Sequence, residues 1–371
     1  MIVFFSMSEF QEIAHSGGKI ELHFEEPNGV ALGFTHAGGH GMSLFQMGVS
    51  LDGKKLEYLP LGGMDMLPPE PPSPIVPVFI ISDREKCYGR NCPKCHSYFR
   101  TSRPAPVLRC PYCSYRDRNA AFTTPNQLQF IHKIRESYLT AFNEKRSITI
   151  DLDKLADELP ENKPTWIYSE ERQQNSYDCP TSDCKTRYDI LGEYAGCPTC
   201  GKRNSLQVFE RHITEVEEQF NKANALLADS QEREVEWEKL SRCVSDFEAM
   251  ARDLQGQFSL LPATPKRKKE IEGISFQSLL KANECLQNWF GFDILFRFSD
   301  DDKTFLNRMF NRRHVLTHNG GRIDQEYLDK TGDTTVKLHQ KIAVRSKEIK
   351  RLIPLLRTVA QNIFQGFESI S

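Results

Sequence analysis

The chain has 371 residues, and at roughly 150 residues per domain this length predicts two or three domains. Its 48 lysines and arginines and 50 aspartates and glutamates leave a net charge of −2, which excludes a polybasic, histone-like protein. With 39% hydrophobic and 26% charged residues, the composition is that of a folded protein and excludes collagen-like and wholly disordered chains.

No stretch of the sequence approaches the roughly 18 apolar residues that a membrane-spanning helix needs. The apolar residues 1–5 are few and lack a basic segment before them, so we predict a first strand there and not a signal peptide. Eight of the 11 cysteines fall into four close pairs, a pattern typical of zinc sites in a reducing compartment. We therefore expect a soluble, cytoplasmic protein that uses no membrane.

Residues 1–80 are expected to form a small β-rich module. Strand-like runs at residues 20–24, 30–34 and 42–49 are separated by glycines. Six of the ten residues 68–77 are proline, which predicts a stiff connector and argues against a central strand there.

Two cysteine modules are expected next, at residues 81–125 and 176–208, either as a degenerate repeat or as independent insertions. The segment between them, residues 126–175, is expected to hold one helix and a short strand at residues 147–151. The apolar residues that suggest this helix are Leu128, Ile131, Tyr138 and Phe142.

From residue 209 to residue 371, apolar residues recur every three or four positions and predict a helical bundle. In chain order we expect one interrupted helix or two helices to about residue 254, a Pro- and Lys-rich loop at 262–269, a helix within 276–290, a helix from Ser299 to Asn319, and a last helix at about 335–367 kinked at Pro354. The predicted fold class is multidomain α+β, with a β-rich N-terminal module, two zinc ribbons and an all-α C-terminal bundle.

The paired cysteines predict two structural zinc sites. Four thiolates can surround Zn²⁺ tetrahedrally, which leaves no open position for water and so argues against a catalytic metal. Disulfides or redox chemistry are the alternatives, and Cys87 and His96 are possible substitute ligands. The expected ligands are Cys92, Cys95, Cys110 and Cys113 in the first site and Cys179, Cys184, Cys197 and Cys200 in the second.

The first cysteine module is locally basic, with seven arginines and lysines and one aspartate between residues 90 and 118. Basic groups beside aromatic faces are typical of a nucleic-acid surface, and Arg100, Arg103 and Arg109 are the expected RNA contacts. The interleaved aromatic residues have an alternative role in closing the small core of the module. The second module is nearly neutral, which favours a structural or partner-binding role.

A second basic segment lies near the end of the helix that reaches Asn319. No acidic residue lies between Thr304 and Arg322, so phosphate would be attracted to this segment. The RNA-binding candidates here are Arg308, Arg312 and Arg322. Arg313 shares a helix side with apolar residues, which predicts a packed or partner-facing position. His318 lies in the last turn, where the helix dipole favours a protonated imidazole and suits it to proton transfer.

Residues 313–318, Arg-His-Val-Leu-Thr-His, match the R-x4-6-H motif and resemble the HEPN superfamily. The Asn-Gly-Gly that follows and residues 286–293 are similar to its RiboL-PSP-type branch. The resemblance covers about residues 209–370 and implies a helical bundle that dimerises and cleaves single-stranded RNA without a metal cofactor. It also implies a role in toxin or antiviral defence.

The resemblance implies that Arg313, His318 and His314 are catalytic. The RNA 2′-hydroxyl would attack the adjacent phosphorus, with His318 as general base or acid, Arg313 stabilising the phosphorane and His314 in support. The product would carry a 2′,3′-cyclic phosphate. Side chains at i and i+5 lie about 140° apart on a helix, so one regular helix does not bring both to a single phosphate. A second subunit or unwinding near Asn319 could do so, and a homodimer is expected.

Two other classes of function are kept open. One is a non-catalytic, zinc-containing nucleic-acid-binding regulator whose bundle serves dimerisation, and the other is an interaction scaffold. A metalloprotease is disfavoured because Val315 stands where an H-E-x-x-H helix needs glutamate.

Overall fold

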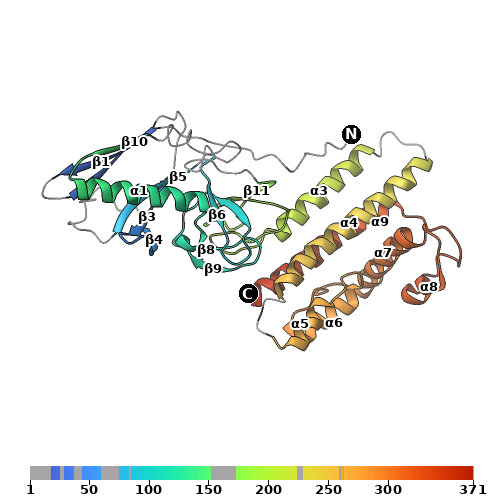
Figure 1. The fold of residues 1–371 in the computed structure, drawn as a ribbon. Helices are drawn as coiled ribbons and strands as arrows, with labels where there is room; N and C mark the ends of the chain where they lie inside the picture. Colours follow the sequence, from blue (N-terminus) through green and yellow to red (C-terminus); the bar gives the residue numbers. More distant parts are fainter. Residues whose placement is uncertain are drawn as a thin grey trace. The chain divides into compact units, whose positions relative to one another are not determined.

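The computed structural model describes residues 18–25, 29–36, 44–59, 75–82, 85–151, 173–223, 229–258, 261 and 263–370 (Figure 1). The chain divides into two compact units, residues Met1–Asn204 and Ser205–Ser371. Secondary structure is mixed α and β, as predicted, with the strands in the first unit. None of the helices within the described ranges is both long and apolar enough to cross a bilayer.

The first sheet of unit 1 has the strand order β10-β1-β2 and is antiparallel. Strand β1 spans Gly18–Glu25, β2 spans Gly29–His36, and β10 spans Ile148–Asp151. The short strand predicted after the connecting helix is therefore present, and it completes the sheet of the N-terminal module. The strand expected at residues 1–5 lies outside the described residues.

A second antiparallel sheet has the order β4-β3-β5. Its strands are β3 (Leu44–Ser50), β4 (Leu56–Leu59) and β5 (Ile75–Ile81). The prediction of a connector through residue 77 is wrong at its end, because Pro77 lies within β5. Proline is tolerated there because β5 is an edge strand, whose outer side needs no ladder hydrogen bonds. The rest of the predicted connector, residues 68–74, lies outside the described ranges.

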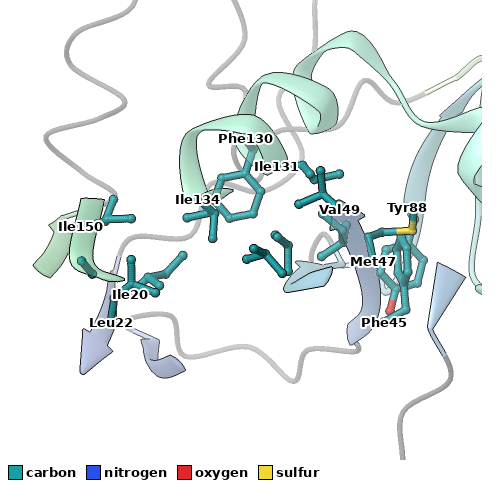
Figure 2. Packing of buried hydrophobic residues seen from close by; sticks show 14 residues of the cluster. Ile20, Leu22, Phe45, Met47, Val49, Tyr88, Phe130, Ile131, Ile134 and Ile150 are labelled. Atoms are coloured by element: carbon teal, nitrogen blue, oxygen red, sulfur yellow. The ribbon is translucent and has the colours of Figure 1, made fainter. Parts of the chain in front are cut away.

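Helix α1 (Pro125–Glu144) begins with a capping box in which Thr124 and Gln127 satisfy each other's backbone N–H groups. Its buried face carries Phe130, Ile131 and Ile134, and Figure 2 shows these side chains beside those of the strands. They join Ile20, Leu22 and Ile150 of the first sheet with Phe45, Met47 and Val49 of the second in one core. The helix is confirmed, but Leu128 and Phe142 of the predicted stripe are 36% and 37% exposed.

The two cysteine modules share a third sheet, of order β11-β12-β7-β6, and are not independent. Strands β7 (Tyr98–Thr101) and β12 (Arg187–Ile190) come from different modules and pair directly. Strand β6 (Tyr88–Asn91) extends the sheet on one side and β11 (Asn175–Asp178) on the other. The hairpin of β8 (Val107–Arg109) and β9 (Arg116–Arg118) and a 3₁₀ turn, η1 (Asn119–Phe122), complete the described part of this region.

The regular elements of unit 2 are all helices within the described residues, as predicted, apart from one isolated β-bridge between Arg322 and Lys341. Figure 1 shows α3, α4 and α9 running alongside one another, and α4 also contacts α5 and α7. The helices are α3 (Ser205–Ala223), α4 (Asp229–Phe258), α5 (Pro265–Glu272), α6 (Leu279–Phe290), α7 (Asp300–His318), α8 (Gln325–Thr331) and α9 (Ser346–Ile370).

Two of the helix predictions need correction. The segment expected as a loop at residues 262–269 contains most of α5, which Thr264 caps and Pro265 begins. The last helix starts at Ser346 and not near residue 335. The backbone of residues 339–342 is hydrogen-bonded to the segment after α7 instead, with the His339 N–H donating to the Ile323 carbonyl and the Ile342 N–H to the Gly321 carbonyl. Pro354 lies inside α9, as expected.

Helix α7 begins and ends where the sequence predicts. The Ser299 hydroxyl accepts a hydrogen bond from the Asp302 N–H, and three aspartates follow it in the first turn, where the helix dipole favours negative charge. At the other end, Gly320 and Gly321 adopt φ values of +57° and +80°, which other residues rarely adopt. This termination places His318 in the last helical turn.

Candidate functional site

The first cysteine cluster has the geometry of a tetrahedral zinc site. All four Sγ atoms of Cys92, Cys95, Cys110 and Cys113 lie within 4.8 Å of one another. Two of the edges, Cys92–Cys113 and Cys95–Cys110, measure 3.7 and 3.6 Å. With Zn–S bonds of about 2.3 Å, the edge of a tetrahedron is about 3.8 Å, so the cluster fits Zn²⁺.

The second cluster fits equally well. Its ligands are Cys179, Cys184, Cys197 and Cys200, with Sγ separations of 3.5 Å for Cys179–Cys200 and 3.7 Å for Cys184–Cys197. The wider Cys179–Cys184 spacing is accommodated by a turn in which the Cys184 N–H donates to the Thr181 carbonyl. These distances exceed the roughly 2.05 Å of a disulfide bond, so both clusters are sets of free thiols.

All four cysteine turns of the two clusters have the same backbone conformation at one position. In each turn, the residue directly after the second cysteine has a positive φ. These residues are His96, Ser114, Lys185 and Gly201, with φ values of 59°, 58°, 49° and 84°. The chain therefore adopts the same local conformation in all four turns. The His96 side chain is exposed, and neither His96 nor Cys87 belongs to a cluster.

The ionisation of the thiols also suits a cation. Burial raises the pKa of Cys95, but hydrogen bonds from Ser97, Cys110 and Cys92 outweigh burial and lower it to about 7. Burial raises the pKa of Cys110 and Cys197. Closely spaced, partly buried thiolates repel one another, so a divalent cation is needed to hold all four ionised.

Arg100, predicted to bind RNA, is buried and is not available for that role. Its guanidinium donates to Asp189 at 2.7 Å and also pairs with Glu85. Since Arg100 lies on β7 and Asp189 on β12, the pair joins the two cysteine modules across their shared sheet. The prediction failed because sequence alone did not reveal that Asp189 would lie opposite Arg100.

The aromatic residues of the first module close its core, as the alternative interpretation expected. Phe99 is buried and packs edge-to-face on Phe122. Tyr112 donates to the Tyr98 carbonyl and accepts from the Leu191 N–H, so its hydroxyl is engaged at both sides. These rings are therefore committed to packing and hydrogen bonding within unit 1.

A smaller basic surface remains on the β8–β9 hairpin. Arg109 and Arg116 are paired across the two strands, and Arg118 lies opposite Val107. Like charges at directly paired positions repel, which favours a bound anion between them. Arg103 is exposed nearby in sequence and donates to the Cys184 carbonyl at 2.9 Å. Within the described ranges, no carboxylate lies within ion-pair distance of these four arginines.

In unit 2, Arg312 is buried and anchors α7, contrary to the prediction that it binds RNA. Its guanidinium donates to Glu348 at 2.8 Å and Asp333 at 3.2 Å, and it also contacts the Tyr327 hydroxyl. Arg308 lies 3.9 Å from the same Asp333 carboxylate. The network ties α7 to α8 and to the start of α9, and its two carboxylates leave no role for Arg312 in neutralising phosphate.

Arg313, the next residue, points to a different neighbour. Its Nη2 donates to the Ser245 hydroxyl at 3.1 Å, and its Nη1 lies 3.9 Å from the Glu248 carboxylate. The packed position expected for Arg313 is thus found, against α4. Ser245 and Glu248 escaped the sequence prediction, since nothing in the pattern of α4 distinguished them from other polar helix positions.

Glu248 is 95% buried, yet its Oε1 accepts no hydrogen bond from the described residues. Its other oxygen lies 3.7 Å from Arg252, and Arg313 is its second ion-pair partner. The Nε of Arg313 is likewise buried without a hydrogen-bond partner in the described chain. A buried polar atom without a hydrogen-bond partner lowers the stability of the fold, and such atoms often mark functional sites.

Arg313, His314 and Glu248 line a cleft of about 570 Å³ in unit 2. Lys281 and Glu284 of α6 and Lys330 of α8 also line it. His318 is not among the lining residues, but its ring packs beside that of His314 with their centroids 4.6 Å apart. Arg322 is exposed beyond the end of α7 and is not a lining residue. The cleft therefore combines cations, two carboxylates and an imidazole, a set that can bind a phosphodiester and transfer a proton.

Comparisons of this chain with protein-family models, with curated proteins and with solved structures each find no match.

The zinc geometry predicts the metal content of cysteine variants. Wild type should hold two Zn²⁺ per chain, and Cys110→Ser should hold one, because three thiolates and a hydroxyl make a much weaker site. Cys87→Ser, a change at a buried cysteine outside both clusters, should keep both ions. Elemental analysis of the purified proteins measures this, and two zinc ions in Cys110→Ser would contradict the assignment.

The Asp333 carboxylate predicts a pH-dependent contribution to stability. Burial alone would raise its pKa, but hydrogen bonds from Thr335, Tyr327 and Arg312 lower it from 3.8 to about 2. Such a carboxylate stabilises the folded state above its unfolded pKa, and the effect is lost as pH falls toward 2. The free energy of unfolding should lose about 2 kcal/mol from this group between roughly pH 5 and pH 2.

Urea unfolding at a series of pH values checks this prediction. Asp333→Asn should be less stable at neutral pH and should show a flatter decline below pH 5, whereas the exposed-site control Asp329→Asn should follow wild type. Parallel pH profiles for Asp333→Asn and wild type would show that the carboxylate contributes nothing in this range.

Proposed function

We propose that this chain is a metal-independent endoribonuclease that cleaves single-stranded RNA in the cleft of unit 2. The observation that carries the proposal is that Arg313 and His314 line one cleft, while His318 packs on His314. Two imidazoles beside a guanidinium provide a base, an acid and a cation within reach of one phosphodiester.

The chemistry follows from these groups. One imidazole takes the proton of the RNA 2′-hydroxyl, and the O2′ oxygen attacks the adjacent phosphorus. Arg313 stabilises the charge that builds on the phosphorane oxygens, and the second imidazole protonates the departing O5′ oxygen. The products are a 2′,3′-cyclic phosphate and a 5′-hydroxyl end. His314 takes a larger part than the sequence motif implied, because it is the histidine that lines the cleft.

The Glu248 contact suggests how Arg313 is held before substrate binds. A phosphate entering the cleft would compete with Glu248 for the guanidinium and would leave the carboxylate paired with Arg252. A homodimer is part of the proposal, since His318 is exposed beside the cleft and a second copy would enclose it. The zinc-containing unit 1 is assigned the recognition of RNA or of an activating trigger, through Arg103, Arg109, Arg116 and Arg118.

A second candidate is a non-catalytic RNA-binding regulator. The observation that favours it is that Arg313 is already engaged by Ser245 and Glu248. This candidate predicts binding without cleavage. A role in toxin or antiviral defence belongs to the proposal only through the HEPN resemblance.

Cleavage of an end-labelled single-stranded RNA, with chelator present and zinc content verified, tests the proposal. Arg313→Ala, His314→Ala and His318→Ala should each slow cleavage by about 10²- to 10⁴-fold, the usual contribution of a proton-transfer group or of a charge-stabilising donor. His132→Ala, a histidine of α1 in unit 1, should cleave like wild type.

Wild-type products should end in 2′,3′-cyclic phosphate. Cleavage that needs Mg²⁺, or that persists in all three variants, would contradict the proposed mechanism. Tight binding by a wild type that does not cleave would instead favour the regulator.

A further inference from the structure

Helix α5 carries a concentrated patch of basic side chains in unit 2. It begins Pro265-Lys-Arg-Lys-Lys269, and Lys266, Arg267 and Lys269 are exposed while Lys268 is half-buried. None of these four side chains has a carboxylate within ion-pair distance among the described residues. By contrast, Arg312, Arg313 and Arg357 of the same unit all have such partners.

The distribution of charged residues along α5 is unfavourable with respect to the helix dipole. Three of its four basic residues, Lys266, Arg267 and Lys268, lie in the N-terminal half, and Glu270 and Glu272 lie at the C-terminal end, the reverse of the arrangement that the helix dipole stabilises. The potential i, i+4 pairs from Lys266 to Glu270 and from Lys268 to Glu272 are not formed. The positive charge therefore does not stabilise α5 itself, which favours a role toward a ligand.

The helix is fixed close to the cleft. Gln255 of α4 is buried, and its side-chain amide donates to the carbonyls of Ile271, Glu272 and Ile274 at 2.7 to 3.0 Å. Gln255 lies seven residues, or about 10 Å, along α4 from Glu248, and on the same helix face. Ser275, only two residues beyond the end cap Gly273, already lines the cleft.

The chain that follows α5 leads into the cleft. Its lining includes Ser275, Gln277, Ser278 and Lys281, and Lys281 is exposed. Arg313 and His314 of α7 line the same cleft. A strand with regularly spaced phosphates is the kind of ligand that can reach both the patch and the cleft.

We propose that α5 is a binding platform for the phosphate backbone of single-stranded RNA, and that it holds the segment next to the cleaved phosphodiester. The inference rests on the proposed function for its substrate. The complementarity is of charge and not of sequence, since four flexible cations without partners match successive phosphates and read no base edges. Binding here would lower the KM without changing the chemical step.

The experiment compares two charge-matched triple variants of the full chain. The test variant is Lys266→Gln/Arg267→Gln/Lys269→Gln, and the control is Lys337→Gln/Arg345→Gln/Lys347→Gln, three exposed cations outside the cleft lining. Both are made in a His314→Ala/His318→Ala background so that RNA stays intact, and binding of a fluorescein-labelled, mixed-sequence RNA 20-mer is followed over a range of salt concentrations.

The test variant should bind at least tenfold more weakly at low salt, and the slope of log K against log salt should fall by about 2, as expected for three lost phosphate contacts to a single strand. The control should keep the slope of its parent. In the cleaving background, the test variant should raise KM and leave kcat unchanged.

The outcomes separate this inference from the proposed function. Unchanged binding and KM in the test variant, with cleavage intact, overturn the platform and leave the nuclease standing. The expected loss of binding in a protein that never cleaves supports the platform as an RNA surface and overturns the nuclease. Equal competition by polyglutamate and by RNA of the same charge would indicate an acidic protein ligand and overturn the inference.

Discussion

The buried guanidinium of Arg312 is the interaction on which unit 2 depends most. An arginine that is 4% exposed needs its charge neutralised and its donors filled, and Asp333, Glu348 and the Tyr327 hydroxyl meet that need. Asp333 also holds the turn that follows α8, and Glu348 lies in the first turn of α9. One side chain of α7 therefore fixes the positions of two other helices.

This anchor also sets the direction of its neighbour. Successive residues on a helix point about 100° apart, so once Arg312 is held toward α8 and α9, Arg313 must face elsewhere. Arg313 faces α4, where its guanidinium donates a hydrogen bond to Ser245 and pairs with the Glu248 carboxylate beside the cleft. Unit 1 repeats the principle, because the buried pair of Arg100 and Asp189 joins the two cysteine modules across one sheet. In both units, a buried arginine organises the elements that carry the candidate site.

The sequence predicted features whose cause is local. The eight cysteines of the two clusters follow from spacing, and both ends of α7 follow from the cap at Ser299 and the glycines after Asn319. Helix α1 and strand β10 were also predicted correctly. What failed depended on partners distant in the chain. The basic segments around Arg100 and Arg312 led to the prediction of RNA contacts, but the buried partner Asp189 lies 89 residues from Arg100, and Asp333 lies 21 residues from Arg312. The sequence did not identify Glu248 as a candidate site residue, because only the folded position of Arg313 brings the two side chains together.

We assign different tasks to the adjacent arginines of α7, Arg312 to the fold and Arg313 to the proposed reaction in the cleft. Comparing Arg312→Leu with Arg313→Leu tests this assignment, by measuring the free energy of unfolding and the rate of RNA cleavage at a temperature where both variants are folded. Arg312→Leu should lose about 3–5 kcal/mol, because it leaves the buried Asp333 carboxylate and the half-buried Glu348 carboxylate without their guanidinium partner, and it should keep cleavage while folded. Arg313→Leu should lose about 1 kcal/mol and nearly all cleavage. Equal stability losses, or cleavage lost only in Arg312→Leu, would contradict the account.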